Sequence, residues 1–189
     1  MRWMWIDRVT ELVPRTRLVA VKNVSLAEEH LHDHFAARAG TGSPALPVMP
    51  ASLIVEGMAQ SGGILVGHAS GFAEKVILAK IGRAELSRDA GPGQTLRYTA
   101  TAERMDPAGA AIRGEVHLLD HARPTAGFEP VGVIELVFSF LDQNAGGAGR
   151  AGADFPAHNF VFGESFKTLL RASGIEIPEP GVGSPAAAR

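Results

Sequence analysis

One stretch of the chain, residues 50–71, is apolar around nearly its whole circumference when it is drawn as a helix. A helix with this pattern is buried on all sides. Two polar side chains interrupt it, Glu56 and Gln60, and because they are four residues apart they lie on one face. A buried carboxylate is costly unless it is paired or used. Glu56 is therefore the first candidate for a functional role.

Segments bounded by turn residues predict six strands around this helix; residues 17–24 are rich in β-branched side chains, and residues 95–105 alternate between apolar and polar. Two precede it, over residues 8–13 and 17–24, and four follow it, over residues 75–86, 95–105, 111–120 and 130–141. No helix-length segment separates the last four strands, and parallel crossovers need one, so the sheet is expected to be antiparallel. The fold class is α+β, and a sheet curled around the long helix is the economical way to bury that helix.

The remaining segments divide the chain into a domain and an extension. Ser25 and Glu28 have the spacing of a capping box, which predicts a short helix over residues 26–35. From Asp142 the composition becomes rich in glycine and alanine, as in a linker. A phenylalanine-rich segment, residues 155–173, predicts a docked segment or helix, and the end from Pro178 is expected to be disordered. The expected division is a domain over residues 1–142 and an extension over residues 143–189.

Composition narrows the functional classes. The net charge of −2 and the lack of a basic stripe argue against a nucleic-acid partner. The chain has no cysteine, which excludes disulfides and thiolate chemistry. The long helix is too short and too rich in glycine for a membrane span. The apolar N-terminus reaches Asp7 and Arg8 too early for a signal sequence, so a cytoplasmic location is expected.

The polar residues that could perform chemistry are few. The densest cluster, His30, His32, Asp33 and His34, lies shortly before the long helix. A histidine and the Glu56 carboxylate in a mostly apolar cleft would form the acid–base pair that proton transfer requires. The N-terminus of the long helix adds backbone N–H groups without partners, which suit the polarisation of a carbonyl group.

Four segments of the chain resemble the (3R)-hydroxyacyl-acyl-carrier-protein dehydratases of type II fatty acid synthesis. They are KNVS at residues 22–25, DHF at 33–35, PVMPASLIVEGMAQSGGIL at 47–65 and GPGQ at 91–94. The resemblance covers about residues 5–141. It implies a hot-dog fold, in which a curved antiparallel sheet wraps around a long central helix. It also implies a working homodimer, with a trimer of dimers as the larger assembly.

The resemblance also implies an activity and a set of site residues. Such enzymes remove water from a 3-hydroxyacyl thioester on acyl carrier protein, or on coenzyme A, and give the trans-2-enoyl thioester. By this resemblance His34 is the base, and Glu56 of the opposite subunit is the acid. The N–H of Ala51 would bind the thioester oxygen, with Gln60 and Gly63 also at the substrate site. No metal and no cofactor is implied.

The chain departs from the family pattern at three places near the expected site. The family's G-H-F-P-G reads DHFAA here, the loop over residues 36–46 is longer, and the family's glycine at the helix start is Ala51. These departures leave two other functions open. One is a non-catalytic hot-dog protein that binds acyl chains or stabilises a partner subunit, and the other is a thioesterase on the same fold.

Simpler interpretations of the same residues also stay open. His34 can be a structural histidine with its hydrogen bonds satisfied. Glu56 can belong to a buried ion pair, for example with Arg83. His30 and His34 are four residues apart and could share a metal ion with Glu56 as the third ligand.

Overall fold

The computed structural model describes residues 3–38, 40, 42–141, 159 and 161–177. Its elements follow in the order β1 (Arg8–Val13), β2 (Arg17–Val24), α1 (His30–Asp33), α2 (Ala51–Ala69), β3 (Val76–Leu86), β4 (Gln94–Asp106), β5 (Gly109–Asp120), η1 (Pro124–Ala126), β6 (Glu129–Phe140) and α4 (Glu164–Ala172). All six predicted strands and the long helix are confirmed, with ends that shift by at most two residues.

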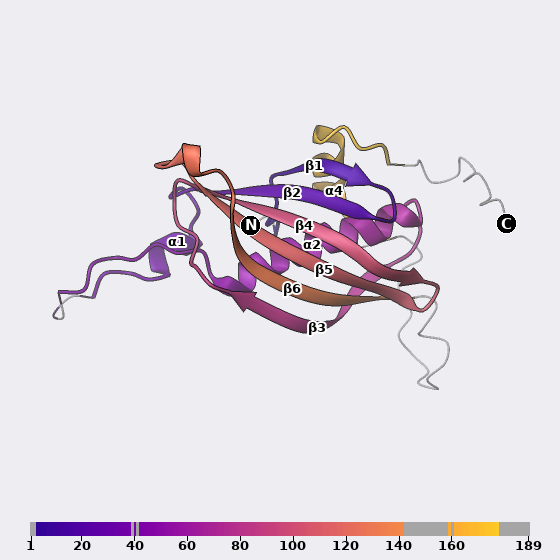
Figure 1. The fold of residues 1–189 in the computed structure, drawn as a ribbon, viewed down its shortest axis with the longest axis horizontal. Coiled ribbons are helices and arrows are strands. Elements are labelled where there is room, and N and C mark those ends of the chain that lie inside the picture. The colour runs from indigo at the N-terminus through magenta and orange to yellow at the C-terminus, as the bar shows by residue number, and fades with distance from the viewer. Residues whose placement is uncertain (1–2, 39, 41, 142–158, 160, 178–189) are drawn as a thin grey trace.

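The six strands form one sheet in the order β1-β2-β4-β5-β6-β3, and all neighbours are antiparallel. The sheet curves over α2, which runs along its inner face (Figure 1). The predicted antiparallel sheet and the hot-dog arrangement are therefore confirmed. β1 and β3 are the two edge strands.

The core lies between α2 and the inner face of the sheet. Leu65, on α2, is fully buried, and a side chain of this kind contributes about 1.5–3 kcal/mol when it is removed from water. Glycines let the helix approach the sheet closely: a Cβ on Gly57 would lie 2.6 Å from the Tyr98 ring, and one on Gly62 would lie 2.9 Å from Phe138. Among the described helices, none is long and apolar enough to cross a bilayer.

The helix before α2 is much shorter than predicted. The sequence predicts it over residues 26–35, whereas only His30–Asp33 are helical and the preceding residues form a turn. One oxygen of Glu28 accepts the Ser25 N–H at 3.4 Å, as a capping box would, but its other oxygen binds Lys22. This tertiary contact explains why the local signal marks a turn rather than the start of a longer helix.

The long loop after His34 is closed at its base. The backbones of Phe35 and Leu46 exchange two hydrogen bonds, at 2.5 and 2.8 Å, and the Arg38 N–H donates to the Ser43 carbonyl at 3.2 Å. The described part of this hairpin loop, residues 35–38, 40 and 42–46, projects from the body on the side of α1 (Figure 1). Because its base is closed, the extra residues leave His34 and Val48 next to each other.

The C-terminal extension packs on the opposite end of α2. Within the phenylalanine-rich segment that the sequence predicts to be docked or helical, Glu164–Ala172 form the helix α4, which lies beside β1 (Figure 1). The Asn159 side chain donates hydrogen bonds of 2.9 Å to the carbonyls of Phe72 and Glu74. The Phe162 ring sits against Gly67, where an added Cβ would approach it to 2.5 Å. The predicted linker from Asp142 and the predicted disordered end from Pro178 lie outside the described residues.

Candidate active site

His34 directly follows α1 and is fixed against the segment that leads into α2. Its Nδ1 lies 2.8 Å from the carbonyl oxygen of Val48, and the Val48 N–H donates to the His34 carbonyl at 2.8 Å. A carbonyl oxygen can only accept, so Nδ1 carries the proton in the neutral ring and Nε2 carries the lone pair. The Phe35 ring lies 4.1 Å away, centroid to centroid. The half-buried imidazole is thus held with Nε2 as its basic atom.

The start of α2, three residues after the Val48 that binds this histidine, presents unpaired backbone N–H groups. Pro50 is the N-cap and supplies no side-chain cap, and Ala51 is exposed at the first helical position. The Met49 N–H donates to the Ala90 carbonyl at 2.7 Å, which fixes the segment from its other side. Among the described residues, no acceptor binds the Ala51 N–H. This end of the helix can therefore bind a carbonyl oxygen or an anion.

Glu56 lies on the second turn of α2 and is half-buried. Its Oε1 accepts a hydrogen bond of 3.0 Å from the Gln60 side-chain amide. Within the described part of the chain it forms no ion pair, and Arg83 pairs with Glu85 and Glu135 instead. The interpretation of Glu56 as the partner of Arg83 is therefore wrong.

Gln60 connects Glu56 to the N-terminal segment of the chain. Its Oε1 accepts a hydrogen bond of 2.8 Å from the backbone N–H of Trp5. Its Nε2 donates to the Trp3 carbonyl at 3.0 Å and also to Glu56. Gln60 itself is 5% exposed, so these contacts satisfy a buried amide. Sequence reasoning missed this role of the tryptophan segment. The signal was an amide on an apolar helix, because such a group must find a partner.

Gly63 lies seven residues after Glu56, two turns further along the same face of α2. It is half-buried, and a Cβ there would approach Phe138 only to 3.7 Å, an ordinary contact. Packing within one chain therefore does not require a glycine at this position. Its small size leaves room on the face that carries Glu56.

Among the described residues, no hydrogen bond or ion pair joins His34 to Glu56. His34 binds Val48, which precedes α2, whereas Glu56 is five residues beyond Ala51, about 7.5 Å further along the helix axis. The described residues also contain no group of three or more side chains able to hold a metal ion, and His30 instead packs against the Trp5 ring at 5.1 Å. The metal interpretation thus receives no support.

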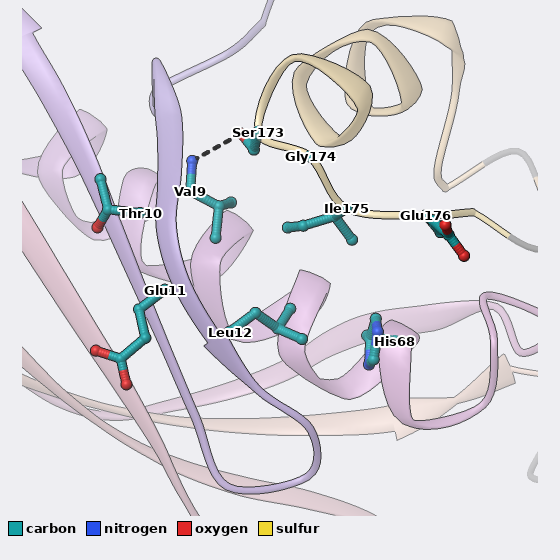
Figure 2. A pocket seen from close by; sticks show the side chains of 9 residues that line it. All are labelled: Val9, Thr10, Glu11, Leu12, His68, Ser173, Gly174, Ile175 and Glu176. Atoms are coloured by element: carbon teal, nitrogen blue, oxygen red, sulfur yellow. Dashed lines mark hydrogen bonds between the residues drawn. The ribbon is translucent and has the colours of Figure 1, made fainter.

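A separate pocket of about 360 Å³ lies at the other end of α2 (Figure 2). It is formed by β1, by His68 and by the segment that follows α4, where the Val9 N–H donates to Ser173 Oγ at 3.0 Å. Burial lowers the pKa of His68. His68 is twelve residues from Glu56, about 18 Å along the helix axis, so this pocket is distinct from the candidate site.

Comparison with known proteins identifies relatives of the chain. The family of FabA-like domains matches residues 2–120. The 3-hydroxyacyl-[acyl-carrier-protein] dehydratase FabZ of Jannaschia sp. is 34% identical over 108 residues, which cover 56% of this chain and 62% of that protein. The FabZ of Symbiobacterium thermophilum is 42% identical over 125 residues, 66% of this chain and 82% of that protein. The chain spans about three fifths of the length of the first relatives it matches.

Solved structures agree on the fold. The dehydratase heterocomplex ApeI:P from Xenorhabdus doucetiae matches with a TM-score of 0.52 at 14% identity, covering 73% of this chain and 83% of that one. An acyl-CoA hydrolase variant from Staphylococcus aureus, in complex with coenzyme A, matches with a TM-score of 0.50 at 13% identity, covering 72% and 71%. At these identities the two matches establish the shared fold alone.

Proposed function

The chain belongs to the family of FabA-like domains, and on this basis we propose that it dehydrates 3-hydroxyacyl thioesters of acyl carrier protein. One observation carries the proposal. The His34 ring is fixed through Nδ1 to the carbonyl of Val48, two residues before the N-cap Pro50 of α2, so Nε2 is the basic atom of the ring. A base next to a site for a carbonyl oxygen is what removal of an α-proton from a thioester requires.

The residues divide the reaction between them. Nε2 of His34 takes the proton from C2 of the substrate, and the electrons of that C–H bond form the C2–C3 double bond. The hydroxyl leaves C3 with a proton from the Glu56 carboxyl and departs as water. The Ala51 N–H binds the thioester oxygen, where negative charge develops. Return of the proton from His34 to Glu56 restores the site.

Gln60 and Gly63 serve the site in different ways. Gln60 uses its amide on Trp3, Trp5 and Glu56, so it orients the acid rather than the substrate. Gly63 leaves space for the acyl chain on the face that carries Glu56.

A homodimer brings His34 of one subunit to Glu56 of the other. The lack of a hydrogen bond or ion pair between the two residues within the described part of one chain supports this arrangement. A further support is the edge strand β3, which exposes Leu78 and Ile81 to 39% and 48%. An exposed apolar edge strand invites pairing with a second chain. The larger trimer of dimers, binding of acyl carrier protein and a cytoplasmic location stay predictions.

The activity is tested by the ultraviolet absorbance of the enoyl thioester formed from a 3-hydroxyacyl thioester. Loss of a general acid or base costs about 10²–10⁴ in rate, so Glu56→Gln and His34→Ala should each fall by that factor. His32→Gln is the matched control, because His32 lies on the same segment and is exposed. Full activity in either site variant would contradict the assigned roles.

The shared site is tested by mixing the two inactive variants. A heterodimer of His34→Ala and Glu56→Gln subunits contains one intact site, so random re-association should restore about one quarter of the wild-type rate. No recovery, with heterodimers shown to form, would place both residues of a working site in the same subunit.

A second candidate is the non-catalytic acyl-binding or partner-stabilising subunit. The exposed methyl group of Ala51 favours it, because it stands at the start of the helix where the thioester would bind. This candidate predicts that acyl carrier protein loaded with an acyl chain binds without turnover at any chain length. Release of free thiol in the same assay would instead indicate the thioesterase.

A further inference from the structure

Lys22 breaks the pattern of its strand. It lies on the inner face of β2 in line with Leu18, Ala20 and Val24, and it is only 5% exposed. A buried ammonium group is strongly unfavourable unless charged and polar partners surround it. The position therefore needs an explanation beyond strand formation.

Three oxygen atoms surround the Lys22 Nζ. It donates to the Asn23 carbonyl at 2.7 Å and to Glu28 Oε1 at 2.5 Å, and Asp7 Oδ1 lies 3.4 Å away. Asp7 precedes β1, and Glu28 belongs to the turn before α1. Lys22 thus links the sheet to the segment that leads to His34.

That segment has little structure of its own. α1 has four residues and no side-chain cap, and a helix of one turn is unstable in isolation. Besides the contacts of His30 and His34 described above, two anchors tie it to the body: Leu31, which is 1% exposed in the core, and Glu28, which Lys22 holds. The Leu31 N–H donates to the Glu28 carbonyl at 3.0 Å, so the two anchors are themselves connected.

We propose that Lys22 and Glu28 are positioning residues for His34. They hold the turn before α1 on the sheet, so that the histidine leaves α1 at the point where Nδ1 meets the Val48 carbonyl. Neither residue touches substrate. The proposal rests on the dehydratase function, because it assigns the purpose of the anchor to the placement of the base.

The test compares Lys22→Met and Glu28→Gln with the wild type. A displacement of about 1 Å in a catalytic group costs on the order of 100-fold, so kcat should fall about 10- to 100-fold in Lys22→Met while KM changes less than about threefold. Glu28→Gln keeps an acceptor for Lys22 and should show a smaller loss of kcat. It also carries the test if Lys22→Met does not fold.

A matched control separates positioning from general stability. Leu169→Ala removes a buried side chain of α4, at the far end of α2, and should lower the melting temperature with kcat unchanged. Amide hydrogen exchange over residues 26–35 should accelerate in both Lys22 and Glu28 variants and stay unchanged in the control. Wild-type kcat in both folded variants, or an equal loss of kcat in Leu169→Ala, would overturn the proposal.

The exchange measurement also distinguishes this proposal from the dehydratase function. If wild-type protein has no turnover but the variants loosen residues 26–35, the proposed function fails while the anchor stands. If wild type turns over and the segment stays protected in both variants, the anchor fails alone.

Discussion

Substitution of Gln60 tests the structure directly, because its buried amide hydrogen-bonds to three groups: the Trp5 backbone N–H, the Trp3 carbonyl and the Glu56 carboxylate. Gln60→Met keeps nearly the same volume but removes the acceptor for the Trp5 N–H and the donor for the Trp3 carbonyl and Glu56. The Trp5 N–H is buried, and an unsatisfied buried donor costs about 1–3 kcal/mol. The two half-exposed acceptors regain water and add little. The expected loss in the free energy of unfolding is therefore about 1–3 kcal/mol.

The assay benefits from the composition of the chain. Its two tryptophans, Trp3 and Trp5, both lie in the segment that Gln60 holds, so tryptophan fluorescence reports on that segment alone. Trp5 is 6% exposed in the folded chain, and its release should shift the emission to longer wavelength and increase quenching by acrylamide. A loss of about 1–3 kcal/mol should lower the melting temperature by about 2–12 °C in a chain of this size.

A second glutamine, Gln94, provides the control variant for this prediction. Gln94 accepts the Gly91 N–H at 2.9 Å in a partly exposed turn, so Gln94→Met should cost less than about 1 kcal/mol and leave the fluorescence unchanged. If Gln60→Met melts within about 2 °C of wild type with unchanged tryptophan emission, the N-terminal segment is held by other contacts and the reasoning is wrong.

Two further predictions concern the other end of α2 and the dependence of stability on pH. Gly67→Ala places a methyl group 2.5 Å from the Phe162 ring and should destabilise the chain by about 1–3 kcal/mol. Gly63→Ala is the control, because its methyl group makes only an ordinary contact. Equal midpoints of urea denaturation for the two variants would contradict this packing argument. Burial lowers the pKa of both His30 and His68, so the unfolded chain binds protons more strongly, and the free energy of unfolding should fall as the pH drops below about 6.5. Urea denaturation at pH 7.5, 6.5 and 5.5 measures this slope, which should be shallower in His68→Gln; a stability that rises toward pH 5.5 would show that these histidines do not govern it.

Local pattern predicted most of the architecture. The position of β2 follows from its β-branched residues and that of β4 from alternation, and both signals depend only on neighbouring residues. The limits of α2 follow from Pro50 at its start and from an apolar surface that must be buried. The family resemblance supplied His34 and Glu56 as candidates, and they remain proposals for the reaction.

Contacts between distant residues decided what the pattern could not. The capping-box signal at Ser25 and Glu28 gave only a turn, because Glu28 binds Lys22 on another element. The sequence does not show where the long loop leaves His34. In the structure the backbone pairing of Phe35 with Leu46 closes the loop, so that Val48 can bind His34.

The roles of Gln60 and the two tryptophans illustrate the same limit. The sequence determined that an amide on an apolar helix must find partners, but Trp3 and Trp5 lie more than fifty residues away. Periodicity carries information over one or two turns of a helix, whereas hydrogen-bond partners depend on where separate segments meet in the folded chain. The sequence therefore determined the elements and their buried faces. The tertiary structure alone decided which atoms hold His34 and Glu56 in place.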